Sequence, residues 1–231
     1  MSLDSRAVSI VPSVLVEDGD TFAAELASVR DTVDMVQIDL ADGEFVPNVT
    51  WAYEHPEEAI ELLDDMPFEL HLMVVNPIET AETWKDAPGL RRYLLHVEST
   101  DDVARAIEEL HRFDKHVGLV LNPSTPVETA LPFLDRIESV MFMGVNPGFQ
   151  GQAFIPETLD RIAMFKQYGT DHPVAVDGAV NLQTIRSIAD AGATVVCPGS
   201  AVFGGPESPA ENIWRLEEVL QGFAPPDEEL V

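Results

Sequence analysis

The sequence has a single cysteine, Cys197, and only three lysines among its 231 residues. One cysteine excludes an intrachain disulfide, and because Cys197 lies in the apolar run 194–197 we interpret it as a core residue. Lys85, Lys115 and Lys166 all lie in or beside segments of helical pattern. No lysine is therefore expected at a strand end, where Schiff-base chemistry would need one.

Long apolar runs are also missing. No stretch approaches about 18 uninterrupted apolar residues, the length typical of a membrane-spanning helix. The first seven residues contain Asp4 and Arg6 and no apolar segment of the kind found in signal peptides. We therefore expect no membrane span and a cytoplasmic location.

Positive charge is scarce as well. Against 41 acidic residues the chain has 13 basic ones, which gives a formal net charge of -28. This balance argues against nucleic acids and anionic membrane surfaces as partners. It is typical of a protein that works in high salt, where self-repulsion is screened, and equally of an ordinary acidic cytoplasmic enzyme.

Apolar runs of strand type alternate with segments of helical pattern along the chain. The expected strands are 8–11, 33–39, 68–73, 92–97, 117–121, 140–143, 174–177 and 194–197. Helices are expected at, or beginning within, 22–29, 57–63, 80–85, 100–103, 122–126, 156–165, 182–191 and 212–220. Eight strand–helix units predict an α/β fold, a single (β/α)8 TIM barrel, with an open doubly wound sheet as the alternative. We expect one domain over 1–231, with the barrel at about 8–222 and mobile termini at 1–7 and 223–231.

Polar side chains end several of these strands, which is where barrels of this kind place their active sites. The set consists of Ser13, Gln37, Asp39, His71, His96, Asn122, Asp177 and Ser200. Asp39 and Asp177 end the second and seventh strands, so they could face each other across the mouth. Two opposed carboxylates suit removal of a proton from one face of a carbon and its delivery to the other. The alternative for each aspartate is a helix cap or a bond to a loop N–H group.

Glycine-bearing segments follow three successive strands and predict a phosphate site. Backbone N–H groups in such loops bind phosphate without a cation, which reconciles an anionic ligand with the acidic composition. Each glycine alone is also typical of a turn. Together they indicate a site formed by Gly148, Phe149, Gln150, Gly151, Gly178, Ala179, Gly199 and Ser200.

A set of motifs, in the order in which they occur, resembles the ribulose-phosphate 3-epimerase family. The motifs are Pro12-Ser13, Asp42-Gly43 with Phe45-Val46-Pro47-Asn48, His71-Leu72-Met73, Asn146-Pro147-Gly148-Phe149 with Gly151-Gln152, Asp177-Gly178 and Gly199-Ser200-Ala201-Val202-Phe203. The resemblance extends from about Ser9 to Gly204. It implies a barrel of the ribulose-phosphate-binding type and interconversion of D-ribulose 5-phosphate and D-xylulose 5-phosphate. The acid and base would be Asp39 and Asp177, acting through a cis-enediolate; a homo-oligomer is also expected.

The resemblance also implies one divalent metal ion, held by two histidines and two aspartates. Asp39, His71 and Asp177 match three of these ligands, but Gln37 stands where the family has the second histidine. A glutamine carbonyl is a poorer ligand for zinc than imidazole. The choice among Zn, Mn, Mg and Fe stays open: the metal could bind weakly, a harder ion such as Mg²⁺ or Mn²⁺ could be preferred, or water could complete the shell.

Other departures concern the substrate. Met73 and Met143 match two of the three methionines that flank the reacting carbons in the family, while Ala41 replaces the third. Glu44 stands where histidine is common, and Ala179 follows Asp177-Gly178 where the family has glycine. Two alternatives therefore remain: an epimerase for a different ketose phosphate, and a barrel that binds a phosphosugar without turning it over.

Overall fold

The computed structural model describes residues 8–149 and 151–223. Within these residues, nine strand segments form one parallel sheet in the order β1-β9-β8-β7-β6-β5-β4-β3-β2. The segments are β1 (Ser9–Ile10), β2 (Ser13–Val14), β3 (Val36–Ala41), β4 (Phe68–Met73), β5 (Leu90–His96), β6 (His116–Leu121), β7 (Ser139–Met143), β8 (Val174–Asp177) and β9 (Val195–Cys197). From β2 to β9, consecutive segments along the chain are neighbours in the sheet, as is usual for strand–helix units.

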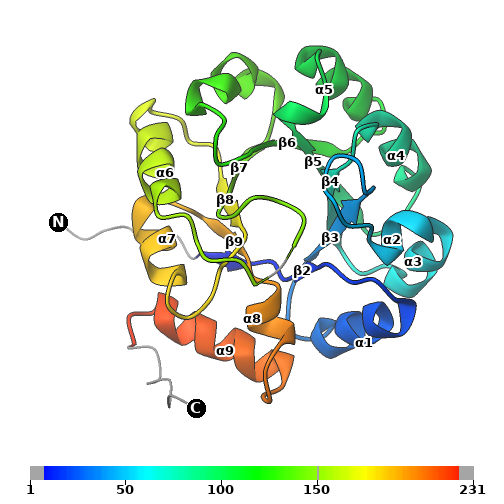
Figure 1. Cartoon of the computed structure of the whole chain (residues 1–231), viewed down its shortest axis with the longest axis vertical. Helices are drawn as coiled ribbons and strands as arrows, with labels where there is room; N and C mark the ends of the chain where they lie inside the picture. The colour runs from blue at the N-terminus through cyan, green and yellow to red at the C-terminus, as the bar shows by residue number, and fades with distance from the viewer. Residues whose placement is uncertain (1–7, 150, 224–231) are drawn as a thin grey trace.

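β1 and β2 are two parts of one strand that closes the sheet into a barrel. β1 pairs with β9 and β2 pairs with β3. Between them, the Val11 N–H donates to Val196 O, and Pro12 O accepts from the Gln37 N–H, both at 2.9 Å. Proline has no N–H group, which explains the interruption at Pro12. The strands therefore form a closed ring (Figure 1), which confirms the predicted (β/α)8 barrel over the open sheet.

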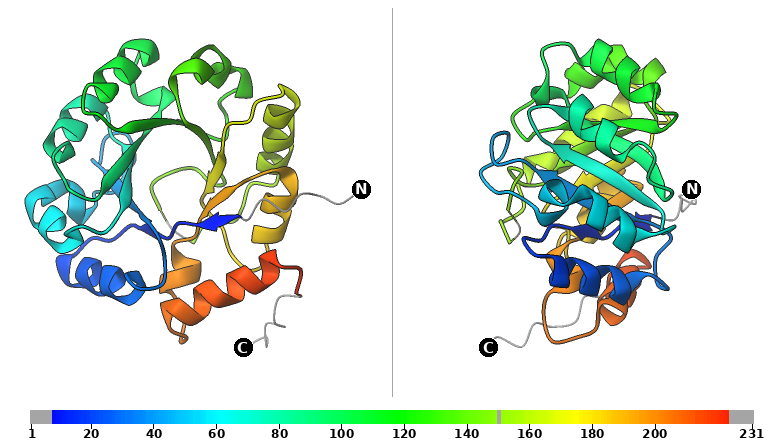
Figure 2. Two further views of the ribbon diagram at one scale, coloured as in Figure 1. Left: turned by 180° about the vertical axis from the view of Figure 1, so that it is seen from behind. Right: turned by 90° about the vertical axis from the view of Figure 1, so that its right-hand side faces the viewer.

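Helices surround this ring (Figures 1 and 2). The α-helices are α1 (Gly19–Val29), α2 (Trp51–Glu54), α3 (Pro56–Leu63), α4 (Pro77–Trp84), α5 (Val103–His111), α6 (Glu157–Gln167), α7 (Ile185–Ala191), α8 (Ser200–Phe203) and α9 (Pro209–Leu220). Two 3-10 helices, η1 (Val97–Ser99) and η2 (Val127–Arg136), complete the set. Caps start several of them: Asp18, Asp102 and Ser208 each accept a backbone N–H in the first turn.

The structure departs from the expected elements in a few places. The second strand does not end at Asp39 but continues to Ala41, so Asp39 lies inside the barrel mouth instead of at its rim. The fifth helix is a 3-10 helix that contains Pro132, because proline removes an N–H donor and disfavours a regular α-helix. The short helices α2 and α8 were not expected. Of the termini predicted to be mobile, 1–7 and 223–231, all but Phe223 lie outside the described residues, and Phe223 is exposed.

The core has two layers because strand side chains alternate between the two faces of the sheet. One layer fills the space between strands and helices and includes Ile38, Leu40, Leu70 and Leu72. The other lies inside the barrel and consists of Val11, Leu94, Val120, Met141, Met143, Ala175 and Cys197. Cys197 is thus buried, as expected of a core residue. Burial on both faces explains why these strands read as nearly continuous apolar runs.

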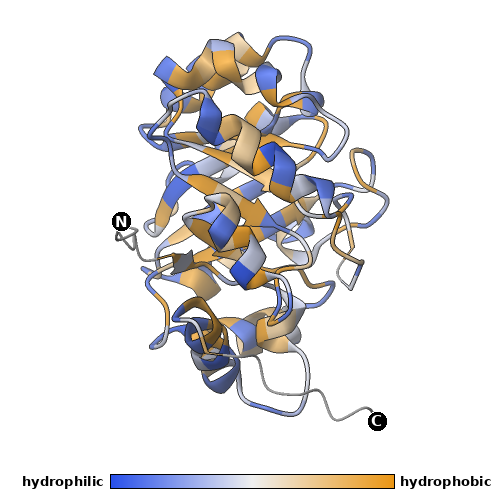
Figure 3. Ribbon diagram, turned by 90° about the vertical axis from the view of Figure 1, so that its left-hand side faces the viewer, coloured by the Kyte–Doolittle hydropathy of each residue, from blue (hydrophilic) through white to orange (hydrophobic). Residues whose placement is uncertain are grey.

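Figure 3 shows hydrophilic and hydrophobic residues interspersed along the helices. The buried residues recur at helical spacing, as in α1, where Phe22, Leu26 and Val29 belong to the core cluster. Throughout residues 8–149 and 151–223, no helix has the length and apolar character needed to cross a membrane. The loops that follow β3 and β7 project from the same end of the barrel (Figure 2, right). This is the carboxyl end of the parallel strands, where the functional side chains gather.

Candidate active site

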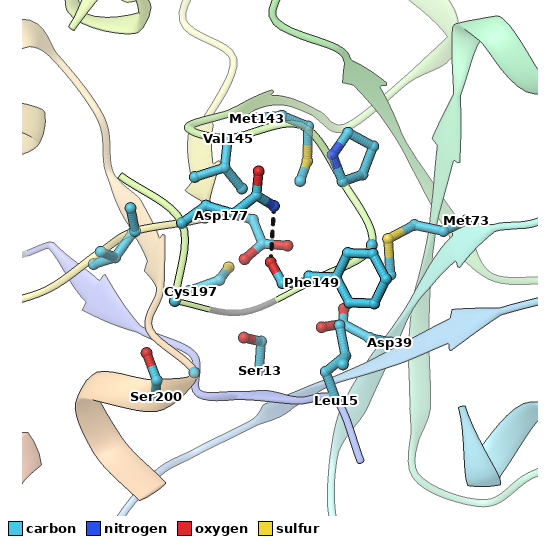
Figure 4. A pocket seen from close by; sticks show the side chains of 18 of the residues that line it. Ser13, Leu15, Asp39, Met73, Met143, Val145, Phe149, Asp177, Cys197 and Ser200 are labelled. Carbon is cyan, nitrogen blue, oxygen red and sulfur yellow. Dashed lines mark hydrogen bonds between the residues drawn. The ribbon is translucent and has the colours of Figure 1, made fainter. Parts of the chain in front are cut away.

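A pocket opens at the carboxyl end of the barrel, and it contains most of the side chains singled out in the sequence (Figure 4). Its described lining includes Ser13, Leu15, Asp39, Met73, Met143, Val145, Pro147, Gly148, Phe149, Gly151, Gln152, Asp177, Gly178, Ala179, Val180, Asn181, Cys197, Gly199 and Ser200. The loop between β7 and α6 crosses over the centre of the ring of strands (Figure 1). The pocket is therefore covered from above by the glycine-bearing loop.

Side chains from three strands converge at and beneath the floor of this pocket: Asp39 and Asp177 line it, whereas His71 lies behind them and is not among the lining residues. The ring nitrogen Nδ1 of His71, on β4, lies 2.9 Å from Asp39 Oδ1 and 3.2 Å from Asp177 Oδ2. Asp39 comes from β3 and Asp177 from β8, so the strands bring together residues far apart in the sequence. His71 is fully buried, and Asp39 and Asp177 are only 3% and 7% exposed.

Burial and neighbouring groups shift the pKa values of Asp39 and His71. Burial, followed by the charge of Asp177, raises the pKa of Asp39 to about 6. Burial by itself would lower the pKa of His71. Hydrogen bonds to Asp177 and Asp39 outweigh this and raise the pKa of His71 to about 10. Without another cation, the His71 ring thus holds a proton between two carboxylates, where positive charge is most strongly favoured.

This arrangement fits a divalent cation. Ligand atoms of Asp39, His71 and Asp177 all lie within 4.8 Å of one another, and all three residues are buried. Two carboxylate oxygens and one imidazole nitrogen that face a common point need either a shared proton or a metal ion. Asp39, His71 and Asp177 are the three family-type ligands predicted from the sequence, so this part of the donor set suits a metal.

Gln37 differs from the other three because it presents a donor. Its Nε2 donates to Asp39 Oδ1 at 2.8 Å and to Asp177 Oδ2 at 3.0 Å, and it lies 3.4 Å from His71 Nδ1. Its Oε1 is buried and makes no hydrogen bond with the described residues. In this orientation the amide bridges the two carboxylates. Only the reversed amide would direct its oxygen toward a cation at this point.

Asp42 has a structural role in the loop after β3. Its Oδ1 accepts the backbone N–H groups of Glu44 and Phe45, both at 2.8 Å, and its Oδ2 accepts that of Val75 at 2.7 Å. These bonds fix the Phe45-Val46-Pro47-Asn48 segment and tie it to the loop after β4. A carboxylate that accepts three N–H groups is well satisfied, so Asp42 shapes the mouth rather than facing the pocket.

The predicted phosphate residues from β7, β8 and β9 line one side of the pocket. Gly148, Gly151 and Gly178 have positive φ angles of 120°, 75° and 98°, conformations that glycine adopts without steric cost. A side chain at Gly178 would come within 2.5 Å of Val145 Cγ2. Gln152 Nε2 donates to Asn146 O and Phe149 O, which holds the β7 loop in its turn. Gln150, also predicted here, lies outside the described residues.

Ala179 follows Gly178 with a φ of 54°. This left-handed conformation costs an alanine roughly 1 kcal/mol relative to its preferred regions. Its carbonyl accepts from Thr184 Oγ1 at 2.7 Å and from Asn181 Nδ2 at 3.3 Å. The strained turn is therefore held by the residues that precede α7.

The remaining wall of the pocket is apolar. Met73 and Met143 project into it, and Phe149 lies over the mouth near Met73 and Asp39 (Figure 4). Phe149 is 51% exposed, although it is aromatic. Ala41, which replaces the third methionine, is fully buried in a small cluster with Val46 and Met73. The space left by the shorter side chain is therefore covered by the loop after β3.

Two further residues lie directly behind His71: His96, which belongs to the strand-end set but was given no role, and Glu98, which the sequence did not single out. His96 Nε2 is 2.9 Å from His71 Nε2, and His96 Nδ1 is 3.3 Å from Glu98 Oε2. Burial lowers the pKa of His96 to about 4. In the sequence, the only sign of this contact was a histidine at a strand end with a glutamate two residues later, His96-Val97-Glu98. The folded barrel is needed to show that the His96 ring contacts His71.

Asn122, also in the strand-end set, does not line the pocket. Its backbone N–H donates to Glu98 Oε1.

Comparison with known proteins agrees with these features. The profile of the ribulose-phosphate 3 epimerase family matches residues 9–203. The chain is 34% identical to ribulose-phosphate 3-epimerase of Schizosaccharomyces pombe over 224 residues, which cover 93% of this chain and 91% of that protein. It is also 34% identical to the enzyme of that name from Mycobacterium tuberculosis over 211 residues, 90% of each chain.

Among solved structures, the fold is similar to that of a mutant tryptophan synthase α-subunit from Pyrococcus furiosus. The TM-score is 0.69 at 15% identity, with 93% of this chain and 98% of that chain covered. Thiamine phosphate pyrophosphorylase from the same organism has a TM-score of 0.58 at 16% identity, with coverage of 96% and 100%. These likenesses concern the barrel alone.

Proposed function

Because the chain belongs to the ribulose-phosphate 3-epimerase family, a family of isomerases, we propose that it interconverts D-ribulose 5-phosphate and D-xylulose 5-phosphate. The observation that carries the proposal is the convergence of Asp39, from β3, and Asp177, from β8, on the buried His71 beneath the pocket. A protein that only bound a phosphosugar would have no use for two buried carboxylates, whose burial is costly.

In the proposed reaction one aspartate removes the proton from C3 and the other delivers a proton to the opposite face. Removal leaves a cis-enediolate, and return of a proton from the other side inverts the configuration at C3. The raised pKa of Asp39, about 6, suits a carboxyl group that exchanges protons near neutral pH. General acid–base catalysis of this kind contributes roughly 10²–10⁴-fold.

We assign a divalent metal to Asp39, His71 and Asp177. When bound, it would polarise the ketose oxygens and stabilise negative charge that develops during proton removal. Gln37 would contribute weakly, by reversing its amide, or through a water molecule. Oxygen-preferring ions such as Mn²⁺ and Mg²⁺ suit this set better than zinc.

The phosphate is assigned to the backbone N–H groups of the segments 148–152, 178–179 and 199–200. Gly148, Gly151, Gly178 and Gly199 line one side of the pocket, and no lysine or arginine is among its described lining residues. Neutral donors need no cation, and the net charge of the chain is screened beyond about 8 Å at physiological salt. Ser13, Met73, Met143 and Phe149 would then contact the carbon chain of the sugar.

A second candidate is an epimerase for a different ketose phosphate. Ala41 and the cluster of Val46 and Met73 around it change one wall of the mouth relative to the family pattern. A comparison of kcat/KM for pentulose and hexulose phosphates decides between the two candidate functions.

The cytoplasmic location, the homo-oligomeric state and the extent of the domain over 1–231 stay predictions.

The proposal is tested by exchange of the C3 proton. The protein, freed of metal and reloaded with Mn²⁺, is incubated with ribulose 5-phosphate in D₂O. Deuterium should enter at C3 of both the residual substrate and the xylulose 5-phosphate formed. Tight binding of the substrate without exchange or turnover would identify a non-catalytic phosphosugar-binding barrel.

A further inference from the structure

A continuous line of polar contacts leads away from the site to the residues that follow β5 and β6. His71 on β4 contacts His96 at the end of β5 through their Nε2 atoms, 2.9 Å apart. His96 in turn contacts Glu98 in η1. Both imidazole rings are completely buried, whereas the Glu98 side chain is 25% exposed. The planes of the two rings differ by only 20°. This nearly parallel arrangement is compatible with an N–H···N hydrogen bond between the rings.

The direction of this line is set at its outer end, because Glu98 can only accept. Its Oε1 accepts the Asn122 N–H at 2.9 Å and also the Thr125 hydroxyl in a short contact. The loop that supplies these donors is anchored by Arg161, whose Nη2 donates to Asn122 O and Thr125 O at 2.8 Å each. Oε2 therefore remains as a fixed acceptor facing His96 Nδ1.

A fixed acceptor determines the tautomer of His96. With the proton on Nδ1, His96 donates to Glu98 and leaves Nε2 as an acceptor. His71 must then supply the proton in the ring-to-ring bond from its own Nε2. The other tautomer of His96 would place a lone pair against the carboxylate.

We propose that His96 and Glu98 are positioning residues, which fix His71 with Nε2 as donor and Nδ1 as the ring atom that faces Asp39 and Asp177. The part of this inference that makes Nδ1 of His71 a metal ligand rests on the proposed function. The ring arrangement itself follows from the contacts alone. Loss of the residue that hydrogen-bonds the second ring nitrogen of a metal-binding histidine typically weakens metal binding by about 10–100-fold.

Glu98→Gln tests the direction of the bonds, because the amide keeps the shape of the carboxylate. Asn122 and Thr125 would hold the amide oxygen, so its NH₂ group would face His96 Nδ1 and force the opposite tautomer. Glu98→Ala only removes the acceptor and leaves room for water. The positioning role therefore predicts that glutamine is at least as harmful as alanine, whereas a merely structural role predicts that the isosteric glutamine is milder. Glu57→Gln, at an exposed position on α3, is the matched control.

The measurements are long-range ¹H–¹⁵N NMR of the histidine rings in metal-free protein at one fixed pH, and calorimetric titration with Mn²⁺. We expect His96 to carry its proton on Nδ1 in the parent and on Nε2 in Glu98→Gln. The dissociation constant for Mn²⁺ should rise by about 10–100-fold in that variant and stay unchanged in Glu57→Gln. The inference is wrong if both tautomer and Mn²⁺ affinity survive in Glu98→Gln, or if alanine is clearly the more harmful substitution. If the parent binds no Mn²⁺ at all, the metal assignment fails, and the NMR spectra still decide on the ring arrangement.

Discussion

Gln37 and Asp177 are 140 positions apart in the sequence, yet the Gln37 amide donates to the Asp177 carboxylate at 3.0 Å. The same nitrogen donates to Asp39 at 2.8 Å. One neutral side chain thus links both carboxylates of the proposed acid–base pair. Where the family has a histidine lone pair, this chain has N–H groups, so metal binding here competes with an existing hydrogen-bonded bridge.

Replacing Gln37 by histidine should tighten zinc binding. Histidine offers a nitrogen ligand, while the amide must reverse to offer a poorer oxygen. We expect the parent to lose metal easily on purification and to regain activity better with Mn²⁺ or Mg²⁺ than with Zn²⁺. Titration of chelator-treated parent and Gln37→His protein measures this, with Gln167→His on the exposed end of α6 as a control for a surface histidine. A parent that retains one zinc through chelation would contradict the assigned role of Gln37.

Asn at position 39 or 177 should abolish turnover while preserving the fold. Each change removes one proton-transfer group and one metal ligand, so kcat should fall by at least about 10²–10⁴-fold. The side-chain shape is retained, and the melting temperature should change by only a few degrees. Steady-state kinetics and thermal unfolding provide the two readouts. Asp160→Asn, exposed on α6, serves as the control, and near-parent activity in either site variant would rule out the two-carboxylate mechanism.

Valine in place of Gly199 should weaken phosphate binding. Gly199 lines the pocket just before α8, so a branched side chain would occupy space beside the proposed backbone donors. KM for the sugar phosphate and the inhibition constant of inorganic phosphate should both rise strongly, with a smaller effect on kcat. Ala201→Val adds similar bulk two residues further on and should leave both constants nearly unchanged. If a folded Gly199→Val protein keeps its phosphate affinity, the phosphate binds elsewhere.

We expect Glu25 to make the fold less stable at alkaline pH than at acidic pH. Burial, followed by the charge of Asp18, raises the pKa of Glu25 on α1 from 4.5 to about 7, and its Oε2 is buried without a hydrogen-bond partner among the described residues. The folded state thus binds this proton more tightly than the unfolded state. Its contribution to stability is fully present below about pH 4.5 and is lost as the pH rises through about 7.

Glu25→Gln should therefore be more stable than the parent at pH 8, and this advantage should shrink at pH 5. Melting curves at the two pH values measure the difference, with the exposed Glu57→Gln as the reference for a lost surface charge. Identical pH profiles of Glu25→Gln and parent protein would show that the Glu25 carboxyl is solvated in solution.

The sequence alone was enough to predict the barrel, and it singled out the three side chains, Asp39, His71 and Asp177, that the structure brings together. Runs such as 140–143 are apolar on both faces, as expected of strands buried between helices and a barrel interior. Because these strands alternate with helical segments, a parallel sheet was expected, and only a closed barrel and an open doubly wound sheet were considered. Asp39 and Asp177 stood out as charged residues that end apolar strands, and their resemblance to the family motifs, together with that of His71 in His71-Leu72-Met73, singled them out as site residues.

Only the tertiary structure decided which of these side chains touch. Residues on different strands meet according to the register between strands and the closure of the ring through Pro12, and neither can be read from spacing along the chain. The sequence therefore marked Gln37 as an odd residue but could not show that its amide bridges both aspartates. It placed His96 at a strand end but could not direct its ring to His71. Hydrogen-bond direction depends on atoms within about 3 Å of one another, and that proximity arises only when the strands have closed into a barrel.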